Sequence, residues 1–139
     1  MIKKLLFLIL FIVFIIIPPK LNAQHSVARE WNEQLLEAIR KDFARPTVHA
    51  RNLFHASVLM YDAWAIFNNA AKPVFLGTTF GGYYTDYTPI AMPIDKNEAS
   101  KEIMSYAVFR LLMHRFENSP NAMETLASLE TFFSSLANA

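Results

Sequence analysis

The sequence predicts an all-α protein of about four helices in an incomplete bundle, preceded by a signal peptide. Four segments repeat apolar residues at three- and four-residue intervals, which is typical of helices with a buried face. Between the second and third of them, residues 71–95 hold all 3 glycines and several aromatic residues. Phe80 to Tyr84 could form a hairpin tip, but no alternating pattern flanks them, so we interpret the whole stretch as a loop.

Length and composition limit what the protein can be. The 139 residues allow one domain and argue against two. The 13 Lys and Arg residues nearly cancel the 12 Asp and Glu residues, so nothing in the composition indicates binding to nucleic acid. With 0 cysteines, the chain has no disulfide, no thiol nucleophile and no thiolate metal site.

The N-terminal region has the pattern of a secretory signal peptide. Lys3 and Lys4 precede an apolar run over residues 5–17, two prolines interrupt it, and Ala23 supplies a small residue for cleavage. The run is shorter than the ~20 residues of a membrane-spanning helix, although an uncleaved N-terminal anchor is the alternative. We expect an exported protein, periplasmic or secreted, with no membrane contact after cleavage. The division is a signal peptide over 1–23 and a helical domain over 24–139.

The first helix is expected over residues 26–44, with Ser26 as its N-cap. Its charged residues fall on one side and its apolar residues on the other, so it should lie at the surface with one face buried. Arg45 and Pro46 end it, because proline restricts the residue before it and cannot continue a helix. The apolar side consists of Ala28, Trp31, Leu35, Leu36, Ala38, Ile39 and Phe43.

The second helix is expected over residues 48–69, capped by Thr47, and is apolar around more than half of its circumference. Arg51, His55 and Asp62 share a narrow stripe on it, within roughly 40° of each other. We interpret them as a polar network that satisfies itself between packed helices. The alternatives are an anion site and a histidine oriented by an aspartate for proton transfer.

The third helix is expected to begin after Asp95, which forms a capping box with Glu98, and to end near Glu117. Ser119 and Pro120 form the cap and first turn of the fourth helix. The third helix, like the second, is apolar on two sides. Four helices of this size bury one stripe each, so we expect a partner, or the rest of a larger protein, to cover the surplus.

No catalytic, cofactor-binding or metal-binding residue can be assigned from motifs. The histidine spacings do not place two ligands on one helical face, and no HExxH pattern is present. Gly81 and Gly82 lack the Lys-Ser/Thr that follows the glycines of a phosphate-binding loop.

Three blocks of sequence carry a resemblance to a known family. Residues 26–40 include SVAREWN and LEAIR, residues 44–55 read ARPTVHARNLFH, and residues 60–65 read MYDAWA. Together they resemble the N-terminal region of bacterial vanadium-dependent haloperoxidase-like proteins, which are related to the type 2 phosphatidic acid phosphatase superfamily. The resemblance covers most of residues 26–70 and continues more loosely through 97–130. It implies an exported, largely helical protein.

The resemblance also implies which part of such a protein is absent. Family members bind vanadate or phosphate through Lys-x6-Arg-Pro, Pro-Ser-Gly-His and Ser-Arg motifs, which surround an oxyanion with cations and hydrogen-bond donors. Arg45 and Pro46 look like the first motif, but Ala38 stands where its lysine would be, and the other motifs are missing. We therefore expect a truncated chain that is not catalytic alone and binds no cofactor. Vanadate would be bound only by a complete family member.

Three roles are open for such a chain. The first is a scaffold that packs against a missing C-terminal catalytic half, whose chemistry would be halide oxidation or phosphate-ester hydrolysis. The alternative is a stand-alone helical interaction module that homodimerises through its surplus apolar faces. A third role is binding of a small ligand by the aromatic loop.

Overall fold

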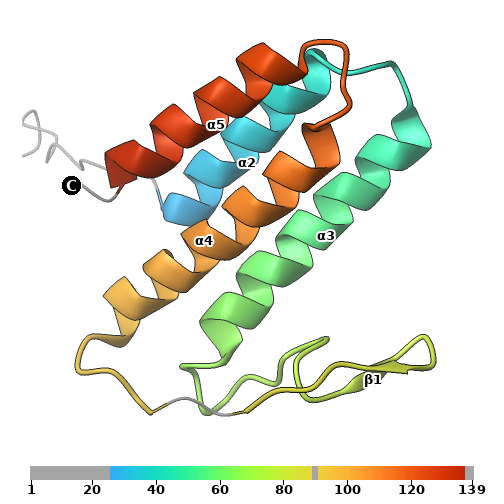
Figure 1. Cartoon of the computed structure of the whole chain (residues 1–139). Coiled ribbons are helices and arrows are strands. Elements are labelled where there is room, and N and C mark those ends of the chain that lie inside the picture. Colours follow the sequence, from blue (N-terminus) through green and yellow to red (C-terminus); the bar gives the residue numbers. More distant parts are fainter. Residues whose placement is uncertain (1–25, 89–90, 137–139) are drawn as a thin grey trace, which may run out of the picture.

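The computed structural model describes residues 26–88 and 91–136, and the expected signal peptide lies outside them. Within these ranges the protein is all-α, which confirms the predicted fold class (Figure 1). Its elements are the helices α2 (Val27–Arg40), α3 (Pro46–Ala65), α4 (Lys96–Phe116) and α5 (Ala122–Leu136), with the short strands β1 (Thr79–Phe80) and β2 (Tyr83–Tyr84) between α3 and α4.

Helix α4 is the centre of the fold, because it packs against α2, α3 and α5 (Figure 1). Helix α3 packs mainly on α4 and more lightly on α2, so it forms one edge of the bundle. Each of the described helices is too short or too polar to cross a bilayer. The arrangement covers α4 on several sides and leaves part of the α3 surface exposed.

The core gathers the apolar stripes that the sequence predicts for the first and third helices, except for Phe43, which lies beyond the end of α2 at Arg40 and is 55% exposed. Trp31 is fully buried, and the ring of Phe132 meets it edge-on with 4.8 Å between the ring centroids. Tight packing of this kind gives small domains most of their stability. The largest fully buried side chains are Trp31, Phe116, Leu35, Leu112, Leu129 and Val108.

Two of the predicted helix caps are confirmed. The Ser26 hydroxyl accepts a hydrogen bond from the backbone N–H of Arg29 at 3.3 Å. The Asp95 carboxylate accepts from the backbone N–H groups of Asn97 and Glu98 at 2.9 and 3.0 Å. Both caps satisfy N–H groups that have no partner inside the helix.

The starts of the other two helices differ from prediction. Thr47 does not cap α3, because the helix already begins at Pro46, with Arg45 at the N-cap and no side-chain cap bond. Proline favours the first helical position, where its missing N–H costs nothing. Likewise α5 begins at Ala122, so Pro120 lies before its first turn.

The interpretation of residues 71–95 as loop throughout is wrong at one place. Phe80 pairs with Tyr83, and β1 and β2 form a short antiparallel hairpin. Gly81 and Gly82 make its turn at φ angles of 57° and 85°. Positive φ angles at both central positions are what a tight hairpin turn requires, and glycine adopts them without strain.

Candidate functional site

One face of α3 carries a row of exposed, mostly apolar residues. Leu53, Phe54, Tyr61 and Trp64 remain 37%, 48%, 40% and 44% exposed. Their spacing places them within about 100° of one another around the helix axis. We call this row the α3 stripe, and its members are Ala50, Leu53, Phe54, Ser57, Tyr61 and Trp64.

The neighbouring side of α3 accounts for its share of the core. Ala56, Met60 and Ala63 are buried there in the main apolar cluster. At about 100° per residue, Met60 lies only about 20° from Leu53 around the helix axis, so the stripe adjoins the buried face and extends the apolar surface of α3 beyond it. Large exposed side chains in one continuous row are uncommon on a protein surface that faces only water.

Most of the surplus apolar surface expected on the third helix is buried or half-buried, although Tyr106 is 57% exposed. Val108 and Leu112 on α4 are fully buried. The ring of Phe109, on another side of α4, stacks on Phe133 of α5 with 4.4 Å between centroids. The excess predicted from the sequence is thus mostly resolved within the described chain for α4 and remains for α3.

Beside the α3 stripe lies a group of cationic and potentially cationic side chains, which we call the cationic edge: Arg51, His55 and Arg115. His55 Nδ1 lies 3.0 Å from a terminal nitrogen of Arg115 on α4. Because a guanidinium only donates, Nδ1 is the acceptor and the ring proton resides on Nε2. Burial, followed by the charges of Arg115 and Arg51, lowers the pKa of His55 below its usual value.

The cationic edge has no acidic partner among the described residues. None of the ion pairs formed there includes Arg51, His55 or Arg115. The Nε atom of Arg115 is buried and lacks a hydrogen-bond partner within the same residues. A buried cationic donor without an acceptor is costly, since water no longer solvates it.

Other unpaired polar atoms belong to the same end of the bundle, where α3 begins and α4 ends (Figure 1). Within the described ranges, buried side-chain atoms without a partner include His49 Nδ1, Asn52 Oδ1 and Ser119 Oγ. Asn52 is only 2% exposed. Within the described ranges, Trp31 Nε1 on α2 and Thr125 Oγ1 on α5 are also buried without a partner, so such atoms are not confined to this end of the bundle.

Asp62 serves a separate purpose, two turns away from His55. It is buried, and its carboxylate accepts three backbone N–H groups, from Val74 at 2.6 Å, Phe75 at 2.9 Å and Leu76 at 3.3 Å. These bonds hold the start of the long loop against the end of α3. Asp62 is thus a structural anchor for the loop.

The structure therefore divides the predicted polar network. Arg51 and His55 lie together, joined by Arg115, whereas Asp62 bonds to the loop. Arg115 was missed because its contact depends on how α3 and α4 pack, which a pattern along one helix does not contain. The partners of Asp62 are backbone groups, which leave no signal in the sequence.

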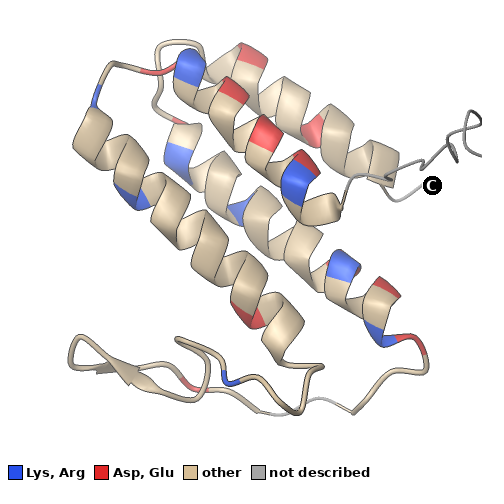
Figure 2. Cartoon of the chain, turned by 180° about the vertical axis from the view of Figure 1, so that it is seen from behind, with Lys and Arg blue, Asp and Glu red and all other residues tan. Residues whose placement is uncertain are grey.

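Charge on α3 itself is sparse, as Figure 2 shows. Arg51 and Asp62 are its only Lys, Arg, Asp or Glu residues. Since Asp62 is buried, the exposed surface of the helix combines apolar side chains with positive charge alone.

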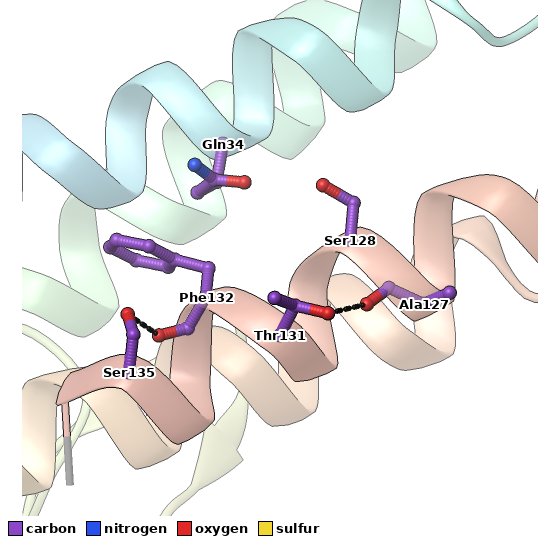
Figure 3. A pocket seen from close by; sticks show the side chains of 6 residues that line it. All are labelled: Gln34, Ala127, Ser128, Thr131, Phe132 and Ser135. Carbon is purple, nitrogen blue, oxygen red and sulfur yellow. Dashed lines mark hydrogen bonds between the residues drawn. The ribbon is translucent and has the colours of Figure 1, made fainter. Parts of the chain in front are cut away.

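A shallow hollow of about 560 Å³ lies between α2 and α5 (Figure 3). The Thr131 hydroxyl donates to Ala127 O at 2.8 Å, and the Ser135 hydroxyl donates to Phe132 O at 2.6 Å. Its lining has no ionisable side chain, so it offers no acid, base or charged ligand for chemistry. The lining residues are Gln34, Ala127, Ser128, Thr131, Phe132 and Ser135.

The part of the chain that the structure describes contains no group of three or more His, Asp or Glu side chains placed to hold a metal ion. Comparison with protein-family models, curated proteins and solved structures found no match to this chain. Over residues 26–88 and 91–136, the fold and site define a bundle of four helices with an exposed apolar helix face beside a cationic edge. The family resemblance stays a prediction.

Proposed function

We propose that this chain is a helical packing module of an exported, haloperoxidase-like protein, and that its α3 stripe packs against a separate oxyanion-binding body. The single observation that carries the proposal is the α3 stripe itself. An apolar row of this size on an edge helix is the usual form of a surface that another helix covers.

The location of the resembling blocks supports this role. The residues 44–55 and 60–65 that carry the resemblance include all of the α3 stripe except Ser57, as well as Arg51 and His55. Under this proposal, the blocks resemble the family because they form a surface that packs against the rest of the protein. The oxyanion-binding motifs of family members lie in a different part of the chain.

The described residues do not fit vanadate as a resident cofactor. A bound oxyanion needs donors on several sides. Arg51, His55 and Arg115 lie along one edge, and Arg115 is bonded to His55. The proposed role is accordingly structural, and halide oxidation or phosphate-ester hydrolysis belongs to the partner body.

The proposal includes export to the periplasm or the medium, with cleavage after Ala23. Mass spectrometry of the chain produced in its bacterial host tests this directly, since the mature protein should begin at Gln24. A product that retains residues 1–23 would contradict cleavage and favour the N-terminal anchor.

Two measurements test the functional proposal. Calorimetric titration of the chain with vanadate and with phosphate should give no binding heat, and tight stoichiometric binding would contradict a purely structural role. Reading the host genome beyond codon 139 should reveal Pro-Ser-Gly-His and Ser-Arg motifs in helical coding sequence. A stop codon followed by unrelated sequence, together with a dimer in light scattering, would favour the homodimeric module instead.

A further inference from the structure

We propose that the α3 stripe receives one amphipathic helix of a different polypeptide segment, and that this helix carries Asp or Glu side chains that pair with Arg51 and Arg115. This inference rests on the proposed function and specifies the chemistry of the partner. Two observations carry it: the apolar α3 stripe, and the positive charges of Arg51 and Arg115, which form no ion pair among the described residues.

The stripe has the length and spacing of a helix-binding surface. From Ala50 to Trp64 it runs for about 21 Å along α3, at a rise of 1.5 Å per residue. Apart from the adjacent Leu53 and Phe54, the residues follow at intervals of three or four, which is how one helix presents a seam to another. A helix of about four turns would cover it.

Covering the stripe would also remove water from the cationic edge. His55 neighbours Phe54, with 5.8 Å between ring centroids, so the stripe and the edge adjoin. Arg115 already lacks an acceptor for its Nε atom among the described residues. Desolvating two guanidinium groups without counter-charge is unfavourable, so an occupant that binds tightly must bring carboxylates. A partner with Lys or Arg at those positions would be rejected.

The charge pattern also argues against a second copy of α3 as the occupant. Another α3 would present the same apolar row and another Arg51 and His55. Its only acidic residue, Asp62, is buried and accepts three backbone N–H groups. Pairing of two α3 helices would therefore leave both cationic edges without partners.

The test uses the full chain and two designed helical peptides of about 18 residues. Both have one Leu-rich stripe; the acidic peptide has Glu at the flanking positions and the basic peptide has Lys there. Binding is followed by fluorescence anisotropy of the labelled peptide and by the emission of Trp64, whereas Trp31 is fully buried in the core. The acidic peptide should bind at least about tenfold more tightly than the basic one.

Substitutions in the chain test whether the cationic edge causes the tighter binding of the acidic peptide. The double substitution Arg51→Gln and Arg115→Gln should reduce the preference to about one. The matched control Arg110→Gln changes an exposed arginine on α4 outside the edge and should retain it. Circular dichroism melts confirm that each variant remains folded before its affinity is compared.

Each other outcome overturns the inference in a recognisable way. Equal affinity for both peptides, lost in the Phe54→Ala and Trp64→Ala double variant, would reject the acidic partner and leave the packing function standing. Binding of neither peptide would reject the inference, while the genomic and vanadate tests still decide the function. A dimer of the full chain cross-linked through Ser57→Cys would assign the stripe to a second copy.

Discussion

At the scale of single residues, Asp62 shows how one buried carboxylate organises a segment that has little regular structure. It accepts three backbone N–H groups from residues 74–76 and so fixes the direction in which the chain leaves α3. Charge-assisted bonds of this kind are stronger than neutral ones. The long loop therefore depends on a helix residue for its position.

Replacing Asp62 with Asn should loosen this attachment. The amide keeps one acceptor oxygen and places an NH₂ group against backbone donors, so unfolding free energy should fall by about 1–3 kcal/mol. Denaturant unfolding measures the loss, and hydrogen exchange at residues 74–76 should accelerate. Asp86→Asn, an exposed carboxylate in the same loop, is the control. Equal effects of the two substitutions would show that Asp62 is not the anchor.

His55 should make stability depend on pH. Burial, Arg115 and Arg51 lower its pKa in the folded protein relative to the ordinary value of 6.5. The folded state then binds this proton less readily than the unfolded chain, so stability is complete above pH 6.5 and declines as the pH falls toward the lowered pKa.

Melting temperatures of the protein and of His55→Gln, compared from about pH 7.5 down to about pH 5, test this. The variant should lose less stability on acidification. Since the remaining histidines are common to both proteins, parallel curves would mean that His55 does not contribute.

At the scale of elements, α3 and α4 are helices of similar length that differ in how much of their surface is covered. Both are apolar on more than one side, but α4 lies between three helices and α3 lies at the edge. Removing apolar groups from the α3 stripe should therefore cost little, in contrast to the same change in the core.

The Phe54→Ala and Trp64→Ala double variant should lose less than about 1 kcal/mol of unfolding free energy, because both side chains are half exposed and alanine favours helix. Leu112→Ala, a fully buried position, should lose about 2–5 kcal/mol. Denaturant unfolding measures both. The stripe variant should also bind less of a hydrophobic dye. A loss comparable to that of Leu112→Ala would show that the stripe is packed.

The sequence predicted the elements better than their contacts. Helices were predictable because their signals involve residues that are close in sequence. Examples are the spacing of Trp31, Leu35 and Ala38 and the cap at Asp95. The β1–β2 hairpin was missed because strands of two residues have no measurable alternation. The cationic edge was predicted in part, since Arg51 and His55 share a helix face, but Arg115 joins them only through the packing of α3 on α4.

At the scale of the whole molecule, the described chain is a bundle with one open side. Its core is built around α4, and the α3 stripe and the cationic edge lie side by side on α3, although large exposed apolar side chains also occur elsewhere, for example Tyr106 on α4 and Met123 on α5. From the stripe and the cationic edge we infer, as proposed above, that another helix covers α3.

The most direct test of that claim is the accessibility of the α3 stripe where the protein is produced. The chain has 0 cysteines, so Ser57→Cys on the stripe and Ser128→Cys on exposed α5 each introduce a single reactive thiol. Both should react with a bulky maleimide at similar rates in the purified chain. In cells of the native host, Cys at position 57 should be protected while Cys at position 128 is not; equal labelling of the two in those cells would contradict a covered α3.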